Sequence, residues 1–302
     1  MGIRRERNIE NLQIYSLLVP VLALIFVFCY IPLYGVLIAF QDYVPGSPFI
    51  GPDVTWVGLK YFSRFVHSEY FWRLIRNTLV LSGLNLLFGF TLPILFALLL
   101  DQIRRMQFRK FVQTASYLPT FLSTVIVAGM VISFIDVNGI ITNVLSLFGL
   151  PAMNYRLSKA AFPAIYTVTN VWKSFGFGSI LYLSTITSID PGLYESARMD
   201  GANRFQQVIH ITLPGIQRII AINLIMAVGG ILGTNSDLIL LLYHSATYEV
   251  ADVIGTYVYR LGIVGGEYSY TAAVGLFMSV IGFALTFTAN RISNKLTDYG
   301  LW

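Results

Sequence analysis

Long apolar runs separated by short polar segments dominate the hydropathy pattern of this 302-residue chain. A membrane-spanning helix needs about 20 mainly apolar residues, and six stretches reach that length. None alternates apolar and polar positions as a transmembrane strand does, so helices that satisfy their own backbone hydrogen bonds are expected. The predicted spans cover residues 12–41, 75–100, 112–135, 161–188, 217–243 and 268–291.

Composition supports lipid as the surrounding solvent. Hydrophobic residues make up 56% of the chain and charged residues only 12%, against about 25% charged in soluble domains. The mean hydropathy is +0.68. We therefore predict an all-α, polytopic membrane protein in which residues 1–302 form a single transmembrane domain. The lone cysteine, Cys29, permits no disulfide within the chain.

The distribution of Lys and Arg predicts that both termini are cytoplasmic. Inner segments of this topology hold 12 basic residues and outer segments hold 7, which agrees with the positive-inside rule. Basic cytoplasmic loops then account for the net charge of +5, so it does not indicate that the protein binds nucleic acid. The first apolar run is too long for a signal peptide, so we expect a retained anchor. Uncharged residues 137–155, broken by Gly, Asn and Pro, predict a short external or interfacial helix.

A polar cytoplasmic loop, residues 190–215, interrupts the apolar pattern between the fourth and fifth spans. Asp190 followed by Pro191 is a helix start, and the Asp200-Gly201 pair is a break. A second short helix follows, and we expect Leu213-Pro214 to end it and to start the fifth span. Its apolar face consists of Phe205, Val208 and Ile209.

Local physics leaves two interpretations of this loop open. It is either a surface loop resting on the membrane boundary or an element that docks on a partner. In the first, Glu195 and Arg198 form an ordinary helix pair three residues apart. In the second, Glu195 and its small neighbours enter a groove on another protein.

The spacing of the loop resembles the EAA loop of ABC-importer permeases. In that family the loop is a coupling helix that docks in a cleft of the cytoplasmic ATPase subunit. The resemblance implies that Glu195 and Gly201 are the central docking and turn residues. Ser196 departs from the usual alanine but remains small. The matching positions are Glu195, Ala197, Asp200, Gly201, Ala202, Ile211, Leu213 and Pro214.

The resemblance extends over nearly the whole chain. The segments "YSLLVPVLALIFVFCYIPLYGVLIAFQDY", "WVGLKYF", "ILLLYHSATYEVADVIGTYVYRLGI" and the terminal "GLW" are similar to the carbohydrate-uptake branch, especially LplB-like polysaccharide permeases. The outer loop 42–76 is too short for the large external domain of the maltose permease.

This likeness implies the type I importer permease fold in a bacterial cytoplasmic membrane. It further implies a second homologous permease, two ATPase subunits, an extracytoplasmic solute-binding protein and an oligosaccharide or polysaccharide substrate. ATP and Mg would be bound by the ATPase subunits and no cofactor by this chain.

The sequence lacks the motifs of an enzyme. It contains no Gly-Lys dipeptide and so no phosphate-binding loop, and no G-x-S-x-G motif for a nucleophilic serine. Cys29 and the three histidines, His67, His210 and His244, show no metal-ligand spacing. We expect no catalytic or metal site.

Polar residues within the predicted spans are candidates for the substrate pathway, because such groups are costly in lipid and often functional. Each has an alternative role in packing between helices, and Lys173 an alternative in pairing or in reaching the interface. The run "GGILG" (229–233) permits either close helix approach or local unwinding. The candidates are Asn85, Tyr166, Asn170, Trp172, Lys173, Asn223, Asn235, Ser236 and Asp237.

Three other functions remain as alternatives. They are an ABC permease for a non-sugar solute, an ATP-independent secondary transporter or channel, and a membrane-embedded enzyme or scaffold. The loop pattern argues against the last two.

Overall fold

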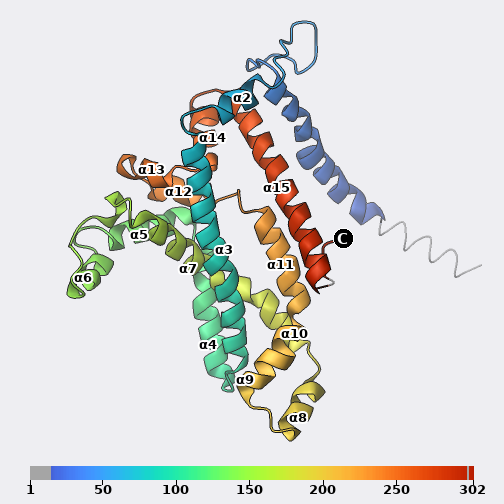
Figure 1. Cartoon of the computed structure of the whole chain (residues 1–302), viewed down its shortest axis with the longest axis vertical. Helices are drawn as coiled ribbons and strands as arrows, with labels where there is room; N and C mark the ends of the chain where they lie inside the picture. The colour runs from blue at the N-terminus through green and yellow to red at the C-terminus, as the bar shows by residue number, and fades with distance from the viewer. Residues whose placement is uncertain (1–14, 298) are drawn as a thin grey trace, which may run out of the picture. The chain divides into compact units, whose positions relative to one another are not determined.

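The protein is helical throughout the part that a computed structural model describes, residues 15–297 and 299–302 (Figure 1). Apart from one isolated antiparallel bridge between Gln41 and Trp56, these residues contain no β-structure. The predicted all-α class is therefore confirmed. The basic segment 1–10 and the first residues of the expected first span, 12–14, lie outside the described residues.

Within the described residues, three helices are long and apolar enough to cross a membrane: Tyr15–Phe40, α3 (Phe71–Asp101) and α15 (Tyr268–Thr297). Two bent helix pairs raise the number to five if each pair is one span. Helix α7 (Phe162–Thr187) has the length of the expected fourth span, but its polar side chains leave it outside this apolar set.

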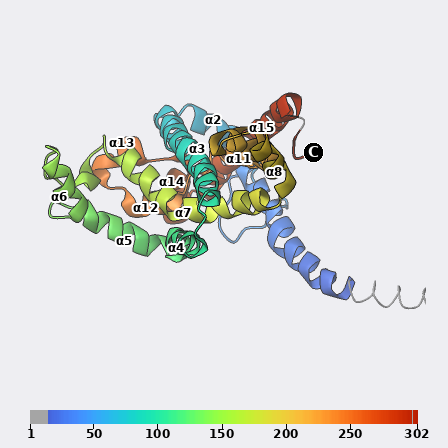
Figure 2. The ribbon, with the colours of Figure 1, turned by 90° about the horizontal axis from the view of Figure 1, so that it is seen from below.

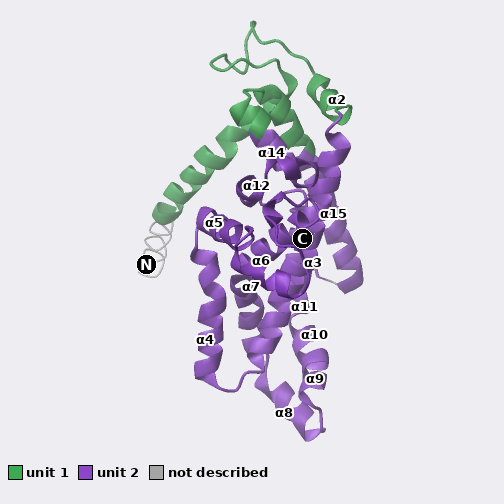
Figure 3. Cartoon of the chain, turned by 90° about the vertical axis from the view of Figure 1, so that its left-hand side faces the viewer, with its two compact units in different colours: residues 1–68, 260–277 green, residues 69–259, 278–302 purple. Residues whose placement is uncertain are grey.

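The chain divides into two compact units, which Figure 3 shows in different colours. The first consists of residues 1–68 and 260–277, and the second of residues 69–259 and 278–302. The first contains the helical segment Tyr15–Phe40, α2 (Lys60–Val66) and the first turns of α15.

Ion pairs and aromatic rings hold the first unit together. Arg64 Nη1 lies 2.6 Å from Glu267 Oε2, and its guanidinium stacks 4.3 Å from the Tyr270 ring centre. Tyr61 and Lys60 donate hydrogen bonds to the Asp42 carboxylate, and these bonds lower the pKa of Asp42. Burial, followed by the bond to Asp42, raises the pKa of Tyr61 to about 12.

Helices α3 and α7 form the centre of the second unit and pack along each other. Buried side chains form two separate clusters along α3. One gathers around Leu81 and Tyr166, and the other around Ala97 and Ile186. The α3 segment between these clusters is therefore free of a continuous apolar core.

Shorter helices surround this pair. Figure 2 shows α5 and α6 projecting to one side of α3. Gly176 allows α7 to approach α4 closely, because a Cβ there would overlap the backbone carbonyl of Ser116. The helices are α4 (Met106–Tyr117), α5 (Thr124–Phe134), α6 (Ile140–Leu147), α8 (Pro191–Met199), α9 (Arg204–Gln207), α10 (Leu213–Gly215), α11 (Gln217–Gly229), α12 (Ser236–Leu242), α13 (Tyr248–Ala251) and α14 (Ile254–Val258).

Two expected spans differ from continuous helices. In residues 112–135, the stretch Met106–Phe121 and helix α5 meet at an angle of 101°. The chain leaves helical geometry at Leu122, and Ser123 caps α5 by accepting a hydrogen bond from Ile126 N. In residues 217–243, α11 ends at Gly229 and α12 begins only at Ser236.

The short helix predicted within residues 137–155 is present as α6. Both interpretations of the "GGILG" run also hold. Residues 230–235 are unwound, while Gly229 allows close approach of α15, because a Cβ there would overlap the Thr286 hydroxyl.

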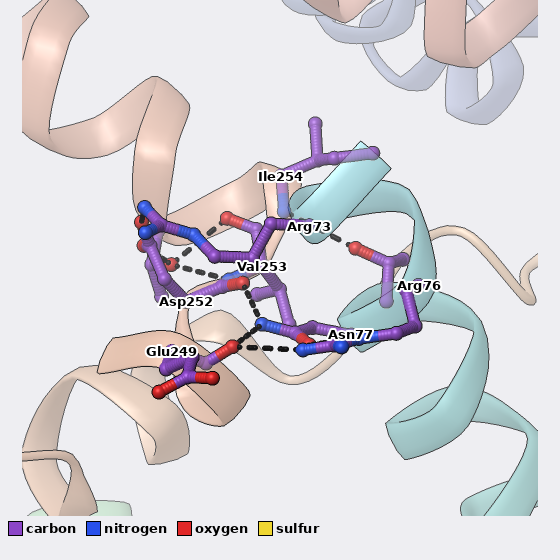
Figure 4. Close-up of polar contacts among 9 residues, drawn as sticks. Arg73, Arg76, Asn77, Glu249, Asp252, Val253 and Ile254 are labelled. Atoms are coloured by element: carbon purple, nitrogen blue, oxygen red, sulfur yellow. Dashed lines mark hydrogen bonds and ion pairs between the residues drawn. The ribbon is translucent and has the colours of Figure 1, made fainter. Parts of the chain in front are cut away.

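Polar contacts fasten the start of α3 to the α13–α14 segment (Figure 4). Asn77 Nδ2 donates to the carbonyl oxygens of Glu249 (2.9 Å) and Asp252 (3.0 Å). The fully buried Asp252 side chain lies 3.6 Å from Arg73 Nη2 and accepts a hydrogen bond from Thr256 Oγ1. Because Asn77 is itself buried, its amide cannot be replaced by solvent.

We predict that Asn77→Leu lowers the free energy of unfolding by about 2 kcal/mol, because the carbonyl of buried Asp252 and the partly buried carbonyl of Glu249 each lose a donor. Thermal unfolding of the purified complex in detergent measures the effect. Arg76→Met is the matched control, because exposed Arg76 also donates to the Glu249 carbonyl, at 3.2 Å. Equal losses in the two variants would contradict the prediction.

Candidate functional site

The coupling loop, residues 190–215, forms short helices at the end of α3 opposite α13 and α14 (Figures 1 and 3). Asp190 caps α8 as predicted, because its Oδ1 accepts a hydrogen bond from Gly192 N at 2.9 Å. Tyr194 OH lies 3.0 Å from Thr212 Oγ1 and ties α8 to the following helical segment. The two helical arms of the loop, α8 and the segment that contains Thr212, are therefore joined by a side-chain hydrogen bond.

The turn between the arms depends on Gly201. Its φ of +81° lies in the left-handed region, which other residues rarely adopt. Asn203 then caps α9 in a reciprocal box: Gln206 N donates to Asn203 Oδ1 (2.9 Å) and Asn203 N donates to Gln206 Oε1 (2.8 Å). The predicted break at Asp200-Gly201 is confirmed.

The prediction that Leu213-Pro214 ends the second helix and starts the fifth span places this boundary slightly too early. The chain remains helical from Arg204 to Gly215, with a π-helical turn at Val208–Thr212, and α11 begins at Gln217. Pro214 therefore lies in the last turn of this continuous helix. The direction changes by 62° only beyond Gly215.

Glu195 is exposed and forms no ion pair with Arg198 within 4 Å in the described part of the chain. The expected apolar face is divided. Val208 packs against the buried cluster around Ile186, whereas Phe205 and Ile209 are exposed. The loop therefore presents both a carboxylate and apolar side chains to its surroundings.

A cavity of about 690 Å³ lies along α3 between the two buried clusters. Its walls come from α3, α7, α11 and the unwound residues 230–235, and none of its lining side chains is charged. Among the predicted pathway residues, Asn85, Tyr166 and Asn223 line it.

Three asparagines form a chain of side-chain hydrogen bonds beside the cavity. Asn170 Nδ2 donates to Asn85 Oδ1 (2.7 Å), and Asn235 Nδ2 donates to Asn170 Oδ1 (3.0 Å). Asn235 N donates to Tyr166 OH (3.2 Å), and Asn235 Oδ1 caps α12 by accepting from Leu238 N (3.2 Å). This chain joins α3 and α7 to the end of the unwound segment.

The remaining pathway candidates lie elsewhere. Trp172 lines a separate, apolar hollow along α3 and α7. Ser236 Oγ donates to the Thr234 carbonyl, and Asp237 is exposed in the first turn of α12. Lys173 contacts the start of α5.

Sequence reasoning missed two cavity hydroxyl groups, those of Ser82 and Thr234. Both oxygens are buried and have no hydrogen-bond partner among the described residues. Buried polar groups normally have partners, so these two hydroxyls are exceptions among the residues that line the cavity. Single Ser and Thr residues in apolar runs carry no sequence signal that separates them from packing residues.

In the described part of the chain, no group of three or more His, Cys, Asp or Glu side chains is arranged to hold a metal ion.

We predict that Gly201→Val loosens the coupling loop, because a β-branched residue is strained at positive φ by about 1–2 kcal/mol. No atom lies within 4 Å of a Cβ built at this position, so the effect arises from backbone conformation alone. Gly201→Asn, which tolerates this region, should retain protection. Amide hydrogen exchange in α8 and α9 measures the difference, and equal exchange in the two variants would exclude this explanation.

We predict that Asn170→Leu lowers the thermal unfolding midpoint, because it removes two side-chain hydrogen bonds at a cost of about 1–3 kcal/mol. Ser174→Ala, one turn away, is the control. Ser174 bonds only to the Asn170 carbonyl of its own helix (2.8 Å). A drop of the same size in Ser174→Ala would show that the asparagine chain is not the source.

Comparison with known proteins identifies the family. Residues 89–298 match the family model described as binding-protein-dependent transport system inner membrane component. The chain is 40% identical to the polygalacturonan/rhamnogalacturonan transport system permease protein YteP of Bacillus subtilis strain 168, over 97% of this chain and 91% of that protein. It is also 40% identical to the protein LplB of the same strain, over 96% and 91%.

Solved structures agree. The chain superposes with a TM-score of 0.86 and 42% identity on a chain of a bacterial ABC transporter involved in the import of the acidic polysaccharide alginate, covering 97% of this chain and 99% of that one. A second structure of the bacterial alginate transporter, in complex with an alginate pentasaccharide-bound periplasmic protein, gives 0.87 and 42%, with 97% of each chain covered. The chain thus belongs to the family of inner membrane components of binding-protein-dependent transport systems.

Proposed function

We propose that this chain is one permease subunit of an ATP-driven importer that carries oligosaccharide or polysaccharide fragments into the cell. The observation that carries the proposal is the combination of an uncharged cavity of mixed polar and apolar lining with an exposed loop at residues 190–215 in a member of this transport family. The named substrates of the relatives, polygalacturonan, rhamnogalacturonan and alginate, support a sugar polymer as cargo.

The cavity has the chemistry of a sugar-binding wall. Tyr166 and Tyr182 offer aromatic rings, and Ser82 and Thr234 offer hydroxyl groups without partners among the described residues. Sugars combine apolar ring faces with many hydroxyl groups, so a mixed aromatic and neutral polar lining matches them. The unwound backbone at 230–235 adds main-chain polar groups, a pattern typical of transporter binding sites.

The coupling loop is the proposed contact with the ATPase subunits. The loop exposes the apolar side chains of Leu193, Met199 and Phe205 as well as the carboxylate of Glu195. Exposed apolar groups bordered by polar ones mark protein-binding surfaces. ATP and Mg would be bound by two partner ATPase subunits, and this chain would supply no catalytic residue.

The proposed topology has one transmembrane domain with six spans and both termini in the cytoplasm. The bent pair ending in α5, helix α7 and the pair ending in α11 would serve as the third, fourth and fifth spans. A second homologous permease would complete the pathway, and an extracytoplasmic solute-binding protein would deliver the substrate. ATPase closure would shift the helices between inward- and outward-facing arrangements.

We predict that Glu195→Lys reduces ATP-driven oligosaccharide uptake about tenfold or more, because a reversed charge at a docking surface is strongly unfavourable. Uptake into proteoliposomes and co-purification of the ATPase measure the effect. Glu69→Lys is the matched control, since Glu69 is exposed immediately before α3, far along that helix from the coupling loop.

Normal uptake and ATPase association in Glu195→Lys would refute the coupling role. Uptake that continues without ATP would favour a secondary transporter, and ATP-driven uptake of a non-sugar solute alone would refute the sugar assignment.

A further inference from the structure

Helix α7 carries a single charged side chain, Lys173, near the middle of its 26 residues. A charge at such a position in a membrane protein is costly and usually serves substrate or ion passage. No step of the proposed function so far requires it.

The contacts of Lys173 leave its charge uncompensated. Its Nζ donates to Thr124 Oγ1 (2.7 Å), and its carbonyl accepts from Thr120 Oγ1 (2.7 Å). The ion pairs among residues 15–297 and 299–302 all involve other cations, so no carboxylate there lies within 4 Å of Lys173 Nζ. An ammonium group has three donors, and the neutral Thr124 hydroxyl occupies one.

Thr124 does not neutralise the charge in another way. It is the first residue of α5, and a helix begins with the positive end of its dipole. The ammonium group therefore lies beside a further partial positive charge, and an anion placed there would be attracted by both.

Lys173 does not itself line the cavity, but its neighbours on α7 do. Ser174 and Phe177 line the cavity, and residues three or four apart share a helix face. Lys173 is four positions before Phe177 and three after Asn170, which belongs to the asparagine chain. The cavity lining is uncharged, so Lys173 is the charged side chain of α7 that adjoins it.

We propose that Lys173 is a specificity-determining residue that pairs with a carboxylate of the cargo, and that the cargo is an acidic oligosaccharide containing uronic acid units. This inference rests on the proposed function. It agrees with the acidic polysaccharide named for the structural neighbour. A charge-assisted bond to carboxylate is stronger than the bond to the Thr124 hydroxyl, so the cargo displaces Thr124 from the ammonium group.

The test uses the complete detergent-solubilised transporter without its solute-binding protein. Binding is measured for trigalacturonate and trimannuronate, each compared with its carboxyl-reduced, neutral counterpart. We expect Lys173→Met to weaken binding of at least one uronate about tenfold or more and to change binding of its neutral counterpart less than twofold. Lys173→Arg should retain the preference for the uronate.

Thr124→Val is the matched control. It removes the same hydrogen bond to Lys173 but keeps the charge, so it should preserve the preference for the uronate. The inference is overturned if Lys173→Met weakens acidic and neutral sugars equally, or if Thr124→Val reproduces the effect of Lys173→Met. It is also overturned if the wild-type transporter binds neutral oligosaccharides as well as uronates, an outcome that leaves the proposed function intact. ATP-driven uptake without any oligosaccharide cargo would instead refute the proposed function.

Discussion

Satisfaction of backbone hydrogen bonds is the constraint on which this structure depends. A chain surrounded by lipid has no water to pair with exposed amide and carbonyl groups, so it must remain helical wherever it faces hydrocarbon. Helices α3 and α15 stay helical over their whole lengths, although Pro93 leaves the Gly89 carbonyl of α3 without its usual amide donor. The chain leaves helical geometry at residues 230–235, which border the cavity. The break in the helix therefore lies at the cavity wall.

Three features of the second unit lie at different positions along α3. The coupling loop lies at one end and the α13–α14 segment at the other (Figure 1), while the cavity occupies the stretch between the two buried clusters. Each cluster resists deformation because interiors are closely packed. The closely packed cluster that contains Ile186 and Ile216 lies between the loop 190–215 and the cavity.

Sequence reasoning succeeded where a feature depends on near neighbours. The Asp190 cap and the Gly201 turn follow from side-chain reach and backbone conformation within a few residues. It placed the end of the second helix at Leu213-Pro214, whereas the helix continues to Gly215, because a proline can occupy the last turn of a helix. It also placed one span across Ser123 without indicating the bend there, because that bend depends on how the flanking helices pack.

Pathway residues were recognised as a type but not as a set. Polar character in apolar runs identified Asn85, Asn170 and Asn235 as candidates. Which of them contact one another depends on tertiary packing, because Asn170 is 85 residues from Asn85 and 65 residues from Asn235. The same criterion selected Trp172, which lines a different hollow. Hydropathy measures the free-energy cost of a side chain in lipid, but it does not indicate on which face of the helix that side chain lies.

The unwound segment at residues 230–235 has a consequence for motion within the second unit. Its backbone hydrogen bonds are few and local, such as Gly230 N to Met226 O and Gly233 N to Gly230 O, whereas a helix of the same length is held by a continuous ladder of bonds. Segments with few hydrogen bonds open at a lower free energy than helices do. Helices α11 and α12 can therefore change direction relative to each other at this segment while each of them stays intact.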